Sequence, residues 1–105
     1  MFFELRQYPI YDGKLDAFVK WMDEVIIPYQ LSKGMVIVGT FADVPNNRYI
    51  WIRRFENEEE KEALYAATYK NDYWQNEIGP KITDYIDRDG MVVDILTATP
   101  RSFMQ

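Results

Sequence analysis

The chain of 105 residues lacks histidine and cysteine altogether. Without histidine, no side chain has an unperturbed pKa near neutral pH, and without cysteine there is neither a disulfide nor a thiolate nucleophile. These two absences exclude Ser-His-Asp hydrolysis, haem held by a proximal histidine, zinc sites built on Cys and His, and thiol redox switching. The sequence therefore predicts no cofactor and no metal site.

Long apolar runs and excess positive charge are also missing. No stretch approaches the ~18 apolar residues of a membrane span, and Glu4 comes too early for a signal-peptide core. The formal net charge of −5 argues against nucleic acid or an anionic membrane as a partner, because such binding depends on Lys and Arg. We expect a cytoplasmic protein that forms one domain over residues 1–105.

The secondary structure is predicted from residue type and periodicity. Four segments rich in aromatic and β-branched residues are predicted strands: 2–8, 35–42, 48–55 and 91–99. Three segments with helical spacing or capping residues are predicted helices: 12–33, 57–70 and 72–85. The predicted N-caps are Asp12, Asn57 and Asp72. Pro28 lacks an N–H group, so we expect a kink or break in the first helix between Val25 and Tyr29.

The order of these elements indicates the fold. A βαββααβ order with a short hairpin and right-handed crossovers favours an α+β ferredoxin-like plait, in which helices cover one face of a four-stranded antiparallel sheet. The first and third strands are then central neighbours. The other face stays bare over some hundreds of Å², which is near the limit for an apolar patch on a monomer. The sheet therefore needs a partner.

Strand alternation separates an aliphatic face from an aromatic and charged one. Leu5, Ile50 and Ile52 point to the aliphatic side. The candidate ligand-binding residues form one predicted patch on the other side: Glu4, Arg6, Tyr8, Tyr49, Trp51 and Arg53. We assign the aliphatic side to the helices, which leaves this patch on the bare face, although a one-residue bulge in either strand would reverse the assignment.

Several spaced motifs between residues 2 and 99 resemble the NIPSNAP family. They are Glu4-Leu-Arg6-x-Tyr8, Gly13, Gly34 with Val38-Gly39 soon after, Arg54-Phe-Glu-Asn57 before an acidic helix, and Trp74-Gln75 near Pro80. The family resembles the wider dimeric α+β barrel superfamily, so the resemblance implies a homodimer of two plaits packed sheet to sheet. It brings no established catalytic residues. The superfamily includes cofactor-independent monooxygenases, isomerases and haem enzymes, and the lack of histidine disfavours the haem branch.

Structural explanations compete with functional ones for the charged residues. Glu4 and Arg6 lie two apart on one strand face, where an ion pair is the alternative to an acid/base role. Arg53 and Arg54 occupy opposite faces, so one of them is expected to be partly buried. A buried guanidinium needs a carboxylate, either Glu4 or Asp94 or one from a ligand.

Three classes of function remain open. The three Trp, eight Tyr and six Phe could build a pocket for a small planar, aromatic or anionic molecule, or they could simply fill the core and the dimer interface. Tyr65 and Tyr69, four positions apart on a predicted helix, are expected to be packing or surface residues. The second class is a cofactor-independent monooxygenase or isomerase in which Arg6 or Arg53 stabilises an enolate or phenolate. The third is a structural or protein-interaction dimer. A pocket with an unpaired arginine favours the enzyme, and a pocket with internally paired polar groups favours the binding protein.

Overall fold

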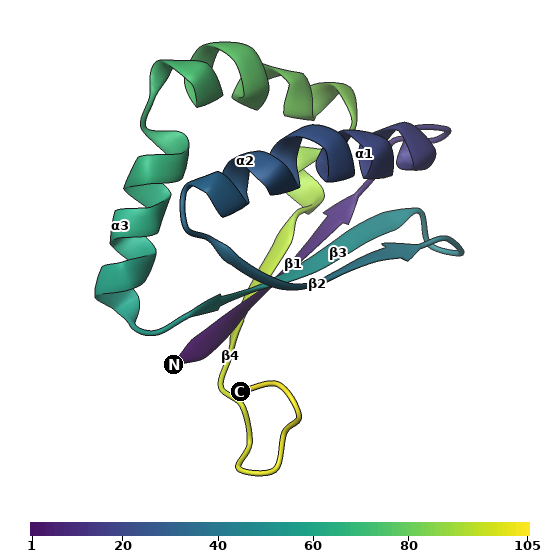
Figure 1. Cartoon of the computed structure of the whole chain (residues 1–105). Coiled ribbons are helices and arrows are strands. Elements are labelled where there is room, and N and C mark those ends of the chain that lie inside the picture. The colour runs from purple at the N-terminus through teal and green to yellow at the C-terminus, as the bar shows by residue number, and fades with distance from the viewer.

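The computed structural model describes residues 1–105 and places the helices on one face of a single sheet (Figure 1). The strands are β1 (Phe2–Pro9), β2 (Val36–Asp43), β3 (Arg48–Phe55) and β4 (Val92–Leu96). The α-helices are α1 (Leu15–Trp21), α2 (Ile27–Ser32) and α3 (Glu58–Tyr69). Wider or tighter helical turns complete the helical layer: η1 (Met22–Ile26), η2 (Tyr73–Ile78), η3 (Gly79–Asp84) and η4 (Arg88–Gly90).

The sheet has the predicted ferredoxin-like topology. Its strand order is β2-β3-β1-β4, and all three pairings are antiparallel. The first and third strands are central neighbours, with Glu4 opposite Arg53 and Tyr8 opposite Tyr49. A bulge in β2 shifts the register between Ile37 and the following residues, and the central pair has none. The α+β plait predicted from element order is confirmed.

The assignment of the two sheet faces was wrong. The aromatic and charged patch lies under the helices, where Tyr49 and Trp51 are each 2% exposed and Glu4 and Arg53 are completely buried. The assignment from strand alternation judges each charged residue by itself and therefore places it on the face of the sheet away from the helices. Here Glu4 and Arg53 are direct cross-strand partners, so each charge is balanced by the other when the pair is buried.

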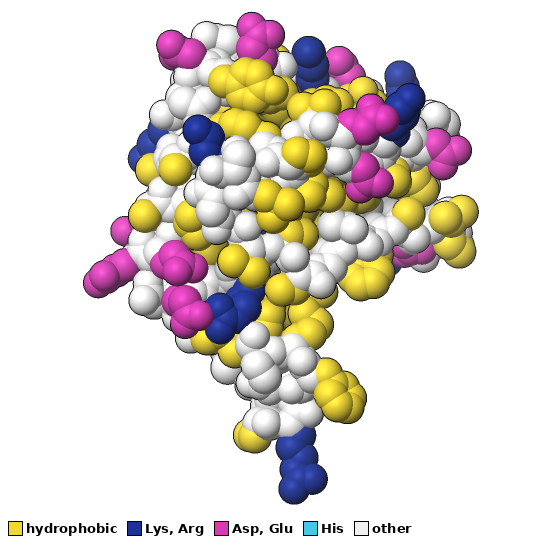
Figure 2. All heavy atoms as spheres, in the orientation of Figure 1, with side chains coloured by type: hydrophobic (Ala, Val, Ile, Leu, Met, Phe, Trp, Pro, Cys, Tyr) yellow, Lys and Arg dark blue, Asp and Glu magenta, His cyan; other side chains and the backbone are white.

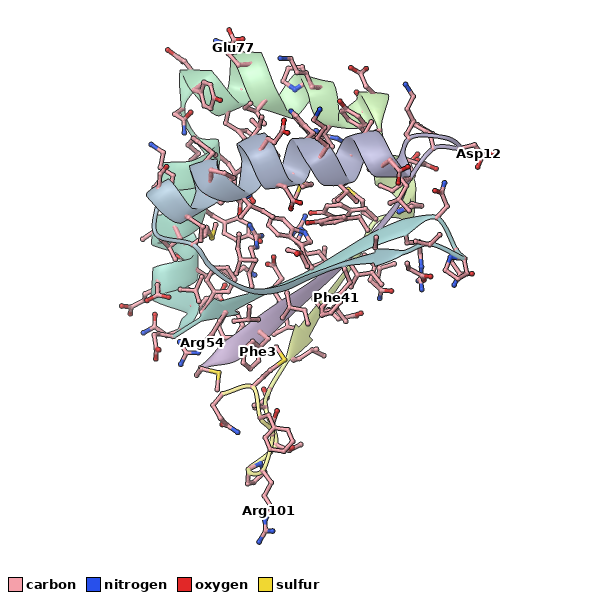
Figure 3. All side chains as sticks on the ribbon, turned by 45° about the vertical axis from the view of Figure 1, so that its right-hand side comes forward. Phe3, Asp12, Phe41, Arg54, Glu77 and Arg101 are labelled. Carbon is pink, nitrogen blue, oxygen red and sulfur yellow. The ribbon has the colours of Figure 1, made fainter.

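The face of the sheet away from the helices is apolar and largely uncovered. Phe41 is 55% exposed there, and Figure 3 shows that it lies below the sheet with Phe3. The same face carries Leu5, Val36, Ile50, Ile52, Val92 and Leu96. Residues 97–105 continue beyond β4 as a tail that points away from the domain (Figure 1). A hydrogen bond of 2.8 Å from Arg54 Nε to the carbonyl oxygen of Gln105 holds the end of this tail near the sheet.

The first helix differs from the prediction at its start and near the proline. It begins at Leu15, and Asp12 does not cap it. Over Met22–Ile26 the α-helical bonding widens to a π-helical turn, in which the N–H of Ile27 reaches five residues back. Pro28 follows in the first turn of α2, which continues directly from this wide turn, so its missing N–H leaves a carbonyl of the preceding turn without the usual donor. The interruption is therefore a wide turn just before the proline, not a break at it.

Capping residues explain where the later helices start. The Asn57 side chain accepts a 2.8 Å hydrogen bond from the N–H of Glu60, as predicted. Asp72 makes no such bond, so its assignment as an N-cap was wrong. Asn71 caps this helical segment instead, because its Oδ1 accepts a 2.9 Å hydrogen bond from the N–H of Trp74. No helix in the structure is both long enough and apolar enough to cross a bilayer.

Replacing the capping asparagine tests this correction. We expect Asn71→Ala to lower the free energy of unfolding by about 1–2 kcal/mol, because it removes the cap and a 2.8 Å bond to the Tyr29 hydroxyl. The neighbouring Asp72→Ala should change it by less than about 0.5 kcal/mol. Urea denaturation of both variants provides the measurement. Equal losses, or a larger loss for Asp72→Ala, would contradict the assignment.

Candidate ligand site

A cavity of about 190 Å³ lies between the sheet and the helical layer. Six of its 14 lining residues are aromatic: Tyr8, Phe18, Trp21, Trp51, Tyr69 and Trp74. Aliphatic side chains fill in between: Met22, Ile26, Ile82, Ile86 and Met91. Its amide and charged lining residues are Gln30, Arg6 and Arg88. The lining includes no carboxylate, so the hollow combines apolar walls with positive charge.

The six predicted site residues divide into three groups around this cavity. Arg6, Tyr8 and Trp51 line it. Glu4 and Arg53 lie behind the wall, where they contact lining residues but are not part of the surface of the cavity. Tyr49 is packed in the core instead, with its ring 5.2 Å from that of Phe18, and its buried hydroxyl has no hydrogen-bond partner.

The network behind the wall centres on the carboxylate of Glu4. Its Oε1 accepts hydrogen bonds from Arg53 Nη2 at 2.5 Å and from Arg6 Nη1 at 3.2 Å. Its Oε2 accepts one from the Tyr65 hydroxyl and lies 3.6 Å from Lys61 Nζ. Three cations therefore surround one carboxylate, and the region keeps a net positive charge.

The ionisation of Glu4 follows from these contacts. Burial alone would raise the pKa of its carboxyl group, but Arg53, the Tyr65 hydrogen bond and Arg6 together lower that pKa to about 2. The carboxyl group is consequently ionised at neutral pH. It is the protein carboxylate that the buried arginine was expected to need, whereas Asp94 lies on the bare face.

Tyr8 presents a hydroxyl hydrogen that no protein atom accepts. Its oxygen accepts hydrogen bonds from Arg6 Nε at 2.7 Å and from Trp51 Nε1 at 2.9 Å. Both partners are donors only, so Tyr8 cannot return a bond to either. Burial raises the pKa of the Tyr8 hydroxyl, although Arg6 acts to lower it, and the group therefore keeps its proton at neutral pH. Because Tyr8 lines the cavity, this O–H group is available to a ligand.

Tyr69 repeats the same arrangement on α3. Its oxygen accepts hydrogen bonds from Arg53 Nη1 at 2.6 Å and from Gln30 Nε2 at 3.1 Å, and its own hydrogen has no acceptor. The sequence predicts only packing or surface roles for Tyr65 and Tyr69, whereas both hydroxyls take part in the buried network. A usable signal was Gln30, a polar residue four positions after Ile26 on the buried helical stripe, because such a residue must find a polar partner.

The free hydrogen-bonding groups of the cavity are thus donors. Arg6 uses Nε and Nη1 within the network, and its Nη2 has no protein partner. The lone pairs of Tyr8 and Tyr69 are occupied, and Gln30 Oε1 accepts from Arg53 at 2.9 Å. Such a lining can hold an oxygen anion or another strong acceptor. It supplies no carboxylate or imidazole that could act as a general base.

Known structures share this fold over nearly the whole chain. A NIPSNAP family protein with unknown function from Agrobacterium tumefaciens is 25% identical, with a TM-score of 0.88, and the match covers 100% of this chain and 94% of that one. A second NIPSNAP family protein from the same bacterium is 22% identical, with a TM-score of 0.87 and coverage of 99% and 98%. An antibiotic biosynthesis monooxygenase is 14% identical, with a TM-score of 0.67 and coverage of 95% and 100%. No protein-family profile and no curated protein matches the chain.

The buried carboxylate makes stability depend on pH. Because the folded-state pKa of Glu4 lies near 2, below its ordinary value of 4.5, its stabilising contribution is complete above about pH 4.5 and is lost as the pH falls toward 2. We expect Glu4→Gln to cost about 3–5 kcal/mol at neutral pH, since it leaves Arg53 buried without a counter-charge. The variant should also lose much of the acid sensitivity between these pH values.

Unfolding by urea at neutral pH and near pH 3 measures both effects. Glu56→Gln is the matched control, because Glu56 pairs with Arg54 at the surface and is 55% exposed. A Glu4→Gln variant as stable as this control would contradict the central role of the buried pair.

Proposed function

We propose that the chain is a member of the NIPSNAP family, two members of which share its fold over nearly their whole length, that it binds a small planar organic anion in the cavity, and that it forms a homodimer through its bare sheet faces. The observation that carries the binding proposal is the donor-only character of the cavity lining. Tyr8, Tyr69 and Arg6 each present hydrogens without a protein acceptor. An oxygen anion complements such a lining better than a neutral or cationic group does.

The size of the cavity narrows the ligand class. A dry cavity of about 150 Å³ can accommodate benzene, whereas drug-sized ligands occupy about 300 Å³ or more. At about 190 Å³ this cavity suits one ring with a small substituent. Trp51 and Trp74 are among the aromatic residues that line it, and aromatic walls suit such a ring.

Charge distribution favours an anion despite the acidic composition of the protein. Figure 2 shows acidic side chains spread over the helical layer and the periphery of this view, not gathered in one patch. By contrast, Arg6 and Arg88 line the cavity, and Arg53 and Lys61 lie with Glu4 behind it. A positive charge in an apolar, partly enclosed space attracts an anion more strongly than the same charge exposed to water.

A second candidate function is cofactor-free catalysis on the same class of ligand. Donors that hold an oxygen anion also stabilise an enolate or phenolate as it forms, and the unpaired Nη2 of Arg6 is the observation that favours this role. Because the cavity lacks a general base, the reaction would have to start from a ligand that ionises by itself. Dissolved-oxygen consumption by a bound phenolate in air-saturated buffer separates a monooxygenase from a binding protein.

The binding proposal predicts a loss of affinity when the Arg6 charge is removed. We expect Arg6→Met, which keeps much of the apolar stem, to weaken binding of benzoate at least tenfold in isothermal titration at low ionic strength. Arg101→Met is the matched control, because Arg101 is exposed at the tip of the loop that the tail forms, far from the sheet (Figure 3). It should leave the affinity unchanged.

Benzamide provides the neutral comparison of the same shape. The protein should bind it more weakly than benzoate, since the amide brings no charge and its N–H groups would face other donors. Equal affinities for benzoate and benzamide, or an Arg6→Met variant that binds benzoate normally, would overturn the anion proposal. Binding of neither compound would leave the structural dimer as the function that remains.

The dimer proposal follows from the apolar face of the sheet. We expect a two-fold homodimer that buries on the order of 1,600 Å² in total, and therefore twice the 12.5 kDa chain mass by light scattering at micromolar concentration. Ile50→Glu, which places a charge at the centre of that face, should give a monomer. Val44→Glu in the exposed hairpin turn is the control and should remain dimeric. A monomeric mass for the unaltered protein would refute the proposal.

A further inference from the structure

The donor-only lining also determines which protonation state of a ligand hydroxyl group fits the cavity. A neutral hydroxyl group on a ring would bring its own hydrogen into a cavity where the hydroxyl hydrogens of Tyr8 and Tyr69 already lack a protein acceptor. The nearby acceptors are taken, because Glu4 receives bonds from Arg53, Arg6 and Tyr65. A buried hydrogen without an acceptor costs free energy, so a neutral phenol or enol fits this site poorly.

The charged groups around the site act in the same direction. From β1 the site faces Arg6 and Tyr8, from α3 Tyr69, and from η4 Arg88. The helical segments α1, η1 and α2 contribute only neutral lining residues. The groups behind the wall are Arg53 on β3, Tyr65 and Lys61 on α3, and Glu4 on β1, and Tyr49 on β3 stacks beside Tyr8. Glu4 is the one anion among them, and it is already paired.

We infer that the cavity takes up weakly acidic ring hydroxyl compounds, phenols or enols, as their oxyanions. In this step the O–H bond of the ligand breaks, its electron pair stays on the oxygen, and the proton passes to the solvent. The oxyanion then accepts hydrogen bonds from the Tyr8 and Tyr69 hydroxyls and from the free end of Arg6. The inference rests on the proposed binding function and specifies its ligand class and the ionisation that accompanies binding.

The two tyrosines are suited to this role because their oxygens are already engaged. Each oxygen accepts one bond from an arginine and one from a neutral N–H group, which fixes the ring and leaves one direction for its hydrogen. Hydrogen bonds in such a chain strengthen one another, so each phenol becomes a better donor. One charge-assisted bond is worth about tenfold in affinity, and two give about a hundredfold preference for the anion over the neutral form.

The test uses 4-nitrophenol, whose ionised form absorbs visible light and whose neutral form does not. At a pH about one unit below the pKa of the free compound, we expect added protein to raise the ionised fraction, with proton release that scales with bound ligand. The shift should correspond to about a hundredfold preference for the anion. 4-Nitroanisole, which has no ionisable hydrogen, should bind at least tenfold more weakly.

Tyrosine-to-phenylalanine variants assign the effect to the proposed donors. Tyr69→Phe keeps the ring and removes one donor, so we expect the preference for the ionised form to fall about tenfold. Tyr8→Phe should cause a smaller loss, because it frees Arg6 Nε and Trp51 Nε1 to donate in its place. Tyr73→Phe is the matched control, since Tyr73 is exposed and does not line the cavity. Thermal unfolding confirms that each variant is folded.

The outcomes separate this inference from the proposed function. Binding of 4-nitrophenol with its neutral spectrum, or binding of benzoate without binding of 4-nitrophenol, would overturn the inference and leave the binding proposal in place. An ionised fraction of 4-nitrophenol that is the same in Tyr8→Phe, Tyr69→Phe and the unaltered protein would also overturn it. Binding of neither 4-nitrophenol nor benzoate would overturn both.

Discussion

Because Glu4 and Arg53 face each other across the two central strands and are both completely buried, removal of Glu4 would leave the guanidinium of Arg53 in the core without a counter-charge. Their 2.5 Å contact lets a carboxylate and a guanidinium lie under the helices. Tyr8 and Trp51 lie an even number of positions from Glu4 and Arg53 on the same two strands, so they point to the same side of the sheet. The position of the cavity above the sheet follows from this one pair.

The same pair sets the chemistry of the cavity. Arg53 donates to the hydroxyl oxygens of Tyr65 and Tyr69, and Glu4 accepts the hydrogen of Tyr65. Tyr65 is thus used completely, whereas Tyr69 keeps its hydrogen. The hydroxyl oxygens of Tyr8 and Tyr69 both accept hydrogen bonds from within the network. Their hydroxyl hydrogens have no protein acceptor, so the network presents donors to the cavity. The hydrogen bonds that stabilise the buried pair are therefore the same ones that leave the Tyr69 hydrogen free.

Element order and spacing predict most of the fold, because they depend on local chemistry. The βαββααβ order, the central position of β1 and β3, and the Asn57 cap follow from local residue patterns. Strand alternation also predicts that the six candidate residues share one sheet face, and three of them, Arg6, Tyr8 and Trp51, line the cavity. The side of the sheet on which the six lie could not be predicted, since it depends on the pairing of Glu4 with Arg53. Tyr69 was missed for a similar reason: its role comes from Gln30, 39 positions away in the chain.

The π-helical turn at Met22–Ile26 has a consequence for the winding of the helix above the cavity. Four sheet-facing residues, Phe18, Met22, Ile26 and Gln30, are each at most 2% exposed and follow one another at intervals of four. An α-helix rotates about 100° per residue, so a row with this interval drifts about 40° at each step and about 120° from first to last. A wider turn in the middle rotates less per residue and takes up part of that drift. The wide turn thereby brings Gln30 closer to the sheet-facing side that Phe18 occupies. The Gln30 amide can then reach the Tyr69 hydroxyl, whereas a regular α-helix would turn it farther away from the sheet.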